Sequence, residues 1–242
     1  MHRRARHLTG RAAGAQLYFD SRRITGLSDG TGVQTWSDLS TNSNDATQAT
    51  SANRPLYKVN IQGGCPMLSF DGTNDVIVCG SAATLGSGCT IVSIFQTNNP
   101  NSYPQHNIFF YYGNSVLYIP YYNWIGVSAY NGSFYFGNYN NPTEGSIAAS
   151  ANNNYRIFSG VVNDSNTNRL FLEGIQKSTG SSTSITGISS SARPTMGAFG
   201  NLTQAYLSGY LGILGYWSTV MNASLRRRFE QAAGFSFKLA CS

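Results

Sequence analysis

From residue 89 onward the chain alternates between short runs of aromatic and β-branched residues and turns rich in Gly, Asn or Pro. The runs recur at spacings of about 8–12 residues, which is typical of antiparallel β-sandwiches. Inside the runs apolar and polar residues alternate, as expected for strands with one buried and one wet face. The sequence therefore predicts strands over residues 90–97, 107–112, 115–122, 125–130, 133–136, 155–163, 169–173 and 175–178.

Charged residues are scarce in this chain. Asp, Glu, Lys and Arg make up 11% of its 242 residues, against about a quarter in an average soluble domain. We therefore expect a surface of neutral polar groups that relies little on salt bridges. The length fits one large sandwich or two small domains. We expect one, because no charged or Pro/Ser-rich linker interrupts the middle of the chain.

Four short motifs follow one another between residues 30 and 77. They are a strand-like segment around Trp36, whose ring should point inward, Asn-Asp-Ala-Thr-Gln at 44–48, Arg-Pro at 54–55 and Phe-Asp-Gly-Thr-Asn-Asp at 70–75. In this order they resemble the opening of a concanavalin A-like (LamG-like) jelly-roll domain, of the kind found in phage structural and bacterial surface proteins. The resemblance covers about residues 17–234. It implies an all-β fold, an antiparallel β-sandwich with one short C-terminal helix. It narrows function little, because this fold hosts lectins, glycosidases, adhesion modules and virion parts.

Two turns have recognisable signals. Residues 66–70 predict a strand that turns at Asp71-Gly72 and takes residues 76–79 as its partner. Glu173-Gly174 lies where a two-residue hairpin turn is expected.

One helix is expected near the C-terminus, over about residues 223–233. Asn222 is a good N-cap, and Gly234 suits the position after the last turn. The arginines in between are expected to face water, and residues 235–239 to return as a final strand.

Positive charge is concentrated at the two ends of the chain. Residues 1–23 carry a net charge of +5, residues 24–225 carry −2 and residues 226–242 carry +3. We accordingly divide the chain into a flexible basic arm, residues 1–14, and a sandwich, residues 15–242. The arginines that precede the first strand are Arg3, Arg4, Arg6 and Arg11.

This arm is expected to dock onto a neighbouring protein, either a second copy of the chain or another virion protein. Nucleic acid is not the expected partner, because about four phosphate contacts give only modest, salt-sensitive affinity. In addition, no aromatic residues interleave with the arginines to stack on bases. A solvated, disordered tail is the alternative.

The first residues lack the apolar run of about 7–15 residues that a signal peptide needs. No segment of about 18 apolar residues is present to insert into a membrane. If Met1 is the natural start, we expect synthesis and folding in the cytoplasm, and a place in a virion or outside the cell after release.

Catalytic signals are weak. Glycoside hydrolysis requires two carboxyl groups, about 5–5.5 Å apart for retention or 6.5–9.5 Å for inversion. The glutamates, Glu144, Glu173 and Glu230, are far apart in sequence, and His106 belongs to a predicted loop. No Gly-x-Ser-x-Gly motif is present. We therefore expect no catalytic residues and a non-enzymatic protein.

A weak calcium site is one interpretation of the loop that contains Asp71, Asn74 and Asp75, since Ca²⁺ prefers carboxylate and amide oxygens. The resemblance adds that some relatives hold calcium at the sheet rim. The alternative is a set of Asx-turn hydrogen bonds to the local backbone. No other cofactor is expected.

The cysteines are too few and too scattered for a disulfide scaffold or a zinc site. Buried free thiols are expected, with a Cys79–Cys89 bridge as the alternative. The four are Cys65, Cys79, Cys89 and Cys241.

Tyrosine and tryptophan crowd between residues 103 and 139. Sugars stack on aromatic rings, while Asn and Tyr groups supply hydrogen bonds. If a glycan binds here, the candidates are Tyr121, Tyr122, Trp124 and Tyr130. The alternatives are core packing, because alternation turns half of the rings inward, and a protein–protein contact, in which Tyr and Trp are common anchors.

We expect first a non-enzymatic structural or adhesion protein. It would be a phage or virus particle component, such as a decoration, fibre or tail-surface subunit, that is anchored through its termini and self-associates. The alternative is a carbohydrate-binding, lectin-like module that acts by aromatic stacking. A glycosidase is a distant third.

Overall fold

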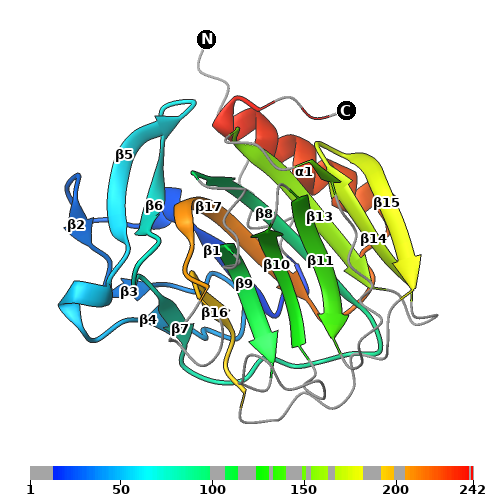
Figure 1. Ribbon diagram of the computed structural model, residues 1–242, viewed down its shortest axis with the longest axis horizontal. Helices are drawn as coiled ribbons and strands as arrows, with labels where there is room; N and C mark the ends of the chain where they lie inside the picture. The colour runs from blue at the N-terminus through cyan, green and yellow to red at the C-terminus, as the bar shows by residue number, and fades with distance from the viewer. Residues whose placement is uncertain are drawn as a thin grey trace.

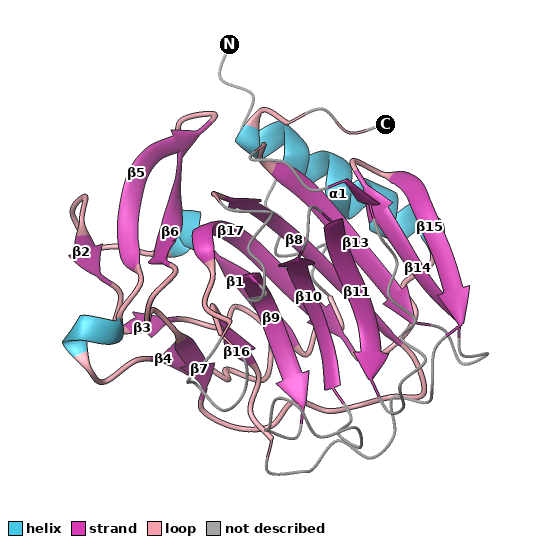
Figure 2. Cartoon of the chain, viewed as in Figure 1, coloured by secondary structure: helices cyan, strands magenta, loops and turns pink. Residues whose placement is uncertain are grey.

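In the described part of the chain, two antiparallel β-sheets stacked face to face and one helix, α1 (Ala223–Phe237), make up the fold (Figure 1). Colouring by secondary structure shows how strongly strands predominate (Figure 2). The expected all-β sandwich with one C-terminal helix is confirmed. The computed structural model describes residues 13–98, 107–113, 124–130, 133–139, 149–150, 154–162, 167–181, 192–198, 205–239 and 241.

Among the described residues, the larger sheet has nine strands arranged around β17. Eight of them lie in the order β15 (Ile175–Ser181), β14 (Thr167–Leu172), β13 (Arg156–Val162), β8 (Cys89–Thr97), β17 (Ser208–Trp217), β6 (Cys65–Asp71), β5 (Leu56–Gln62) and β2 (Thr31–Gly32). The ninth, β1 (Leu17–Asp20), pairs with β17, so that Leu17 lies opposite Tyr216. Because β17 also pairs with β8 and β6, it joins the two halves of the sheet.

The smaller sheet, as far as the structure describes it, has eight strands, four of them only two residues long. Their order is β12 (Ala149–Ser150), β11 (Ser133–Tyr139), β10 (Trp124–Tyr130), β9 (Asn107–Gly113), β16 (Thr195–Met196), β7 (Ile77–Cys79), β4 (Ala46–Thr47) and β3 (Thr35–Trp36). Two 3-10 turns, η2 (Ser21–Arg23) and η3 (Ser51–Asn53), lie between strands.

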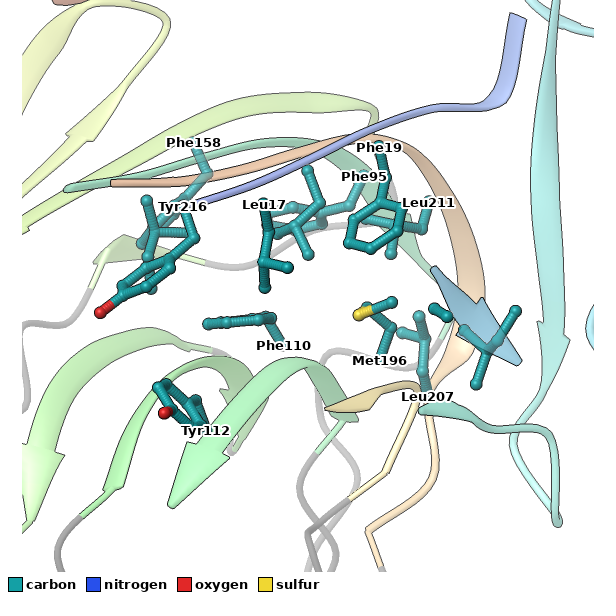
Figure 3. Close-up of a cluster of buried hydrophobic side chains, with 14 of the residues drawn as sticks. Leu17, Phe19, Phe95, Phe110, Tyr112, Phe158, Met196, Leu207, Leu211 and Tyr216 are labelled. Carbon is teal, nitrogen blue, oxygen red and sulfur yellow. The ribbon is translucent and has the colours of Figure 1, made fainter. Parts of the chain in front are cut away.

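The main hydrophobic core fills the space between the sheets. Figure 3 shows Phe110 and Tyr112 of β9 below Leu17, Phe158 and Tyr216 of the larger sheet. The ring centroids of Phe110 and Tyr216 are 6.0 Å apart. Core residues alternate along strands such as β1 and β9, as the period of two requires. In β17 a register irregularity between Leu211 and Ile213 interrupts this alternation.

A second core lies between the larger sheet and α1. Phe229 of the helix packs edge-on against Tyr18, with ring centroids 5.9 Å apart, and against Trp217 at 5.3 Å. All nine residues of β8 are buried because one face of this strand meets the smaller sheet and the other faces the helix layer.

The helix begins where expected but runs further. Asn222 caps it, with Oδ1 accepting a backbone hydrogen bond at 2.8 Å. Gly234 was expected after the last turn but lies inside the helix, where a Cβ would come within 2.5 Å of the Ile157 side chain. The expected strand over residues 235–239 is wrong, since the helix continues to the left-handed C-cap Lys238. Close packing, and not helix termination, therefore requires this glycine.

One arginine of the helix contradicts the expectation that all three face water. Arg226 is 3% exposed, whereas Arg227 and Arg228 are exposed. Arg226 pairs with Glu230, and its guanidinium lies over the Phe171 ring at 3.5 Å from the centroid. The salt bridge lies within α1, and the contacts of Arg226 with Phe171 and of Glu230 with Ser159 fasten the helix to the sheet.

The predicted hairpin between residues 66–70 and 76–79 is also wrong. β6 pairs with β5 and β17, while β7 belongs to the smaller sheet. The Asp71-Gly72 turn therefore carries the chain from one sheet to the other. By contrast, Glu173-Gly174 does connect β14 to β15, and both residues have positive φ angles, of 50° and 81°.

The cysteines are all free thiols, so the alternative bridge between Cys79 and Cys89 is not formed. Within the described segments, no helix is long and apolar enough to cross a membrane. Several predictions fall outside the described residues: the strand over 115–122, the loop residue His106, and the arm arginines Arg3, Arg4, Arg6 and Arg11.

Candidate functional site

The predicted sugar-stacking residues fall on β10 and on the segment before it. Tyr121 and Tyr122 lie outside the described residues. Trp124 and Tyr130 are the first and last residues of β10, the strand between β9 and β11 (Figure 1).

The register of β9, β10 and β11 shows which positions belong to which face. Phe110 of β9 and Phe136 of β11 are fully buried between the sheets, and both pair with Val127 of β10. Cross-strand partners share a face, and neighbours along a strand alternate. The positions of Trp124 and Tyr130 therefore belong to the face turned away from the main core. Core packing between the sheets does not account for aromatic residues at these positions.

Further aromatic positions share that outer face, among them Tyr111 of β9, which pairs with Gly126 and is 3% exposed. Tyr139 is the cross-strand partner of Trp124, and Tyr135 is the partner of Ser128. We call the four positions Trp124, Tyr130, Tyr135 and Tyr139 the aromatic face. Tyr135 and Tyr139 were not among the sequence candidates, because only the strand pairing relates them to Trp124.

A cavity that sequence reasoning missed lies beside β3 and has a volume of about 380 Å³. We call it the β3 cavity. Residues from the turn after β1, from β2, from β3 with its following loop, and from the Arg-Pro motif line it. They are Asp20, Arg23, Ile24, Thr25, Leu27, Gly32, Gln34, Thr35, Trp36, Ser37, Leu39 and Arg54.

Trp36 is the most buried of the polar side chains at this cavity. It is 1% exposed, and its ring lies 5.2 Å from that of Phe19, which confirms that it points inward. Its indole Nε1–H has no acceptor among the described residues. A buried donor without an acceptor is costly, and this one faces the core and not the open part of the cavity.

Two of the motifs of the family resemblance contribute to the wall of this cavity, through Trp36 and Arg54. Arg54 donates from Nε to the Gln48 carbonyl at 2.9 Å and from Nη2 to the Ala49 carbonyl at 2.7 Å. The Gln48 amide in turn donates to the Val76 carbonyl at 3.0 Å. These side chains tie loop backbone together, which gives the motif a structural role. At Gly32 the stem of Arg54 passes so close that an added Cβ would lie 3.2 Å from its Cβ.

The loop proposed for calcium is organised by its own hydrogen bonds. Asp71 Oδ1 accepts from the backbone N–H of Thr73 at 2.7 Å and of Asn74 at 3.2 Å, while Asp75 Oδ2 accepts from the Asp71 N–H at 2.9 Å. Burial, reinforced by the negative charge of Asp71, raises the pKa of Asp75 to about 6. These contacts match the Asx-turn alternative. Calcium binding here stays a prediction, and its test is whether the melting temperature differs between excess Ca²⁺ and EDTA.

Metal-ligand clusters of three or more His, Cys, Asp or Glu are absent from the described part of the chain. Two of the glutamates serve in ion pairs. Glu173 contacts Arg156 at 3.3 Å, and Glu230 contacts Arg226 and accepts a hydrogen bond from Ser159 Oγ. Glu144 lies outside the described residues.

Comparison with known proteins identifies the fold and not a family. No protein-family model and no curated protein matches the sequence. A solved structure of botulinum neurotoxin type C, described as depending on two ganglioside molecules for cell entry, is 11% identical at a TM-score of 0.62. That match covers 93% of this chain and 53% of the toxin chain. The binding domain of botulinum neurotoxin DC in complex with SialylT is 10% identical to this chain, with a TM-score of 0.60. The match covers 92% of this chain and 52% of the toxin chain.

An enzyme shares the same architecture. Trypanosoma rangeli sialidase in complex with sialic acid is 12% identical at a TM-score of 0.59, covering 91% of this chain and 33% of the sialidase. This chain therefore spans about half of the toxin chains and a third of the sialidase. At such identities the likeness establishes the β-sandwich fold alone.

Proposed function

We propose that this protein is a non-catalytic carbohydrate-binding module that presents the aromatic face to a glycan. The observation that carries the proposal is the pairing of Trp124 with Tyr139 on the face opposite to the buried Phe136. Adjacent aromatic positions on neighbouring strands suit a sugar, whose apolar face stacks on rings. The rigid two-sheet scaffold would hold these positions in place without a conformational change.

The structural comparisons support a binding role without assigning a ligand. The botulinum neurotoxin structures are described with gangliosides and with SialylT, and both are binding proteins or binding domains. The sialidase match shows that an enzyme can contain the same fold. In this chain, however, Glu173 and Glu230 are engaged with arginines. We therefore place the activity in binding and not in hydrolysis.

A glycan array probed with the full chain, followed by calorimetry on each hit, tests the proposal. Trp124→Ala should weaken binding about tenfold, which corresponds to ~1.4 kcal/mol. Phe235→Ala is the matched control, because this aromatic residue is 80% exposed on α1, away from β10. Binding that is equal in Trp124→Ala and wild type would remove the aromatic face from the proposal. Hydrolysis of a bound glycan would overturn its non-catalytic part.

A second candidate function, a subunit of a virus or phage particle, is favoured by the position of the chain ends. The Ala13 carbonyl accepts a hydrogen bond from Trp217 Nε1 at 3.2 Å, and Trp217 packs against Phe229 of α1. Cys241 lies beside Gly234 of the same helix. Both ends of the described chain thus meet at α1, which suits attachment to a neighbouring subunit on one side. Such a protein would reside in a virion or outside the cell after release, and it would self-associate or contact other virion proteins.

A further inference from the structure

We propose that the β3 cavity is a separate binding site for a carboxylated monosaccharide, either a uronate or a sialic acid. The site uses none of the positions of the aromatic face, and its argument does not depend on them. Its volume of about 380 Å³ lies within the range of about 300–1,000 Å³ typical of small-molecule sites. That volume accommodates a monosaccharide and excludes a long polymer from its interior.

The charge of the cavity favours an anion. Arg23 and Arg54 bring two guanidinium groups to the lining, against one carboxylate, Asp20. That carboxylate is neutralised by Arg22, which donates from Nε to Oδ1 at 2.8 Å and from Nη2 to Oδ2 at 2.5 Å. The remaining charge is positive, and guanidinium groups bind carboxylates through paired hydrogen bonds.

The donors of Arg54 are partly committed to the fold and partly available. Nε and Nη2 donate to loop carbonyls, which fixes the guanidinium plane. Among the described residues, Nη1 has no acceptor. A guanidinium that is held in this way is preorganised, so that less conformational entropy is lost when an anion binds.

Trp36 lies at the inner wall of the cavity and can report on its occupancy. It is a lining residue, is 1% exposed, and its ring packs against Phe19. Its Nε1–H is buried and has no acceptor among the described residues. A sugar in the cavity would therefore change the surroundings of this group without accepting its hydrogen bond.

The rest of the lining distinguishes a sugar from a bare anion. Ile24, Leu27 and Leu39 provide apolar surface, whereas hydroxyl and amide groups come from residues such as Thr25 and Gln34. A monosaccharide presents the same combination, an apolar ring face with hydroxyls around its edge. Inorganic phosphate would match the arginines but not the apolar side chains.

The indole N–H resonances offer a direct test. The chain has three tryptophans, and the Trp36 signal is assigned by its loss in Trp36→Phe. On titration of the full chain with glucuronate or N-acetylneuraminate, the Trp36 signal should shift and saturate. The Trp217 signal should stay in place, because its N–H is bound to the Ala13 carbonyl. Whichever of glucuronate and N-acetylneuraminate binds more tightly shows whether the cavity prefers a uronate or a sialic acid.

Arginine variants and a neutral sugar test whether the cavity recognises the carboxylate of its ligand. Arg23→Gln should weaken the carboxylated sugar about tenfold, whereas Arg169→Gln, an exposed arginine on β14 at the other end of the sheet, should have no effect. Glucose should bind at least about tenfold more weakly than glucuronate. Equal affinities for glucose and glucuronate, or a Trp36 signal that no sugar moves, would overturn the proposal. Phosphate that competes as well as glucuronate would reduce the cavity to an anion site.

The same spectra separate this proposal from the function of the aromatic face. A carboxylated sugar that shifts only the Trp124 signal supports the aromatic face and contradicts the cavity site. A carboxylated sugar that shifts only the Trp36 signal does the reverse. Trp124→Ala should leave the response of Trp36 unchanged.

Discussion

Asp38 is 6% exposed, and its carboxylate organises the turn after β3. It accepts hydrogen bonds from the backbone N–H groups of Tyr18, Ser40 and Asn44 and from the Ser40 hydroxyl, at 2.7–2.9 Å. Asp38→Ala would leave several buried donors without an acceptor. We expect it to lower the free energy of unfolding by about 3 kcal/mol or more, measured by urea denaturation. Asp29→Ala, at an exposed carboxylate, should leave the midpoint almost unchanged. Equal midpoints for the two variants would contradict the role of Asp38.

Asp75 should make the stability of the fold depend on pH. Its pKa is raised to about 6 in the folded state, first by burial and then by the charge of Asp71. Between pH ~4 and ~6 the folded chain therefore holds a proton that the unfolded chain has released. The contribution of Asp75 to stability falls as pH rises through this window, by at most ~3 kcal/mol for a shift of about two pKa units.

Asp75→Asn provides the check on this pH dependence. Its amide oxygen can still accept the hydrogen bond from the Asp71 backbone, but the group does not titrate. The free energy of unfolding of the variant, measured from pH 4 to 7, should lack the fall that the wild type shows. Parallel curves for the two proteins would remove Asp75 as the cause.

Individual residues were predictable from the sequence where a local signal decides their role. Trp36 points inward and Asn222 caps the helix, as local patterns indicated. Arg226 was not predictable in this way, because its partner Glu230 is buried by sheet residues that are distant in sequence. The β3 cavity was missed for the same reason. Arg23 and Arg54 are separated by 30 residues and meet only through the fold.

At the scale of elements, contact between the two sheets depends on a glycine in β13. A Cβ on Gly160 would lie 2.3 Å from the ring of Phe136 on β11. Gly160→Ala should therefore destabilise the fold by about 1–3 kcal/mol through overpacking. Gly80→Ala is the matched control, since its Cβ would meet only ordinary contacts, at 3.6 Å or more. Thermal melts that rank the two variants equally would contradict the close approach of β13 and β11.

The docking of α1 is a second prediction at this scale. Glu230 is fully buried, pairs with Arg226 and accepts from Ser159 of β13. Glu230→Ala would leave the charge of Arg226 buried without its partner, which should lower the free energy of unfolding by about 3–5 kcal/mol. The double change of Arg226→Met with Glu230→Leu should recover most of that loss, because apolar residues of similar size replace the pair. Urea unfolding of both variants checks this. A double variant as unstable as the single one would contradict it.

Strand partners were harder to predict than the strands themselves. The turn signal at Asp71-Gly72 was correctly placed, yet β6 and β7 belong to different sheets. A turn sequence specifies where the chain bends and not which strand it meets next. At Glu173-Gly174 the prediction was confirmed, because a two-residue loop leaves an antiparallel hairpin as the only close pairing.

For the whole molecule, the sequence indicated the architecture better than the function. Short strands in regular succession and the motifs between residues 30 and 77 predicted a sandwich, and the two stacked sheets confirm it. Function depends on which residues from separate strands share a face or a cavity. Trp124 and Tyr139 are cross-strand partners, and no sequence period shows that relation. The basic arm stays a prediction, and it is best tested on the intact chain.

Self-association through the arm is the prediction that belongs to the molecule as a whole. If residues 1–12 bind a second copy, light scattering on a sizing column should give the full chain a mass well above the 26.2 kDa of a monomer. A chain that begins at Ala13 should return to that mass. The truncation stops there because the Ala13 carbonyl accepts the hydrogen bond from Trp217. Deeper removal would therefore confuse loss of docking with loss of stability.

A charge variant distinguishes the contribution of the arm's arginines to self-association from the contribution of its length. Replacing Arg3, Arg4, Arg6 and Arg11 by serine should lower the mass as the truncation does. Serine at the exposed Arg227 and Arg228 of α1 serves as the control for charge elsewhere. A particle subunit anchored through its arm requires a defined oligomer that the arm holds together, whereas a sugar-binding module can function as a monomer. A monomeric mass for the full chain and for the truncated chain alike would therefore contradict the particle subunit and leave the carbohydrate-binding module as the function to pursue.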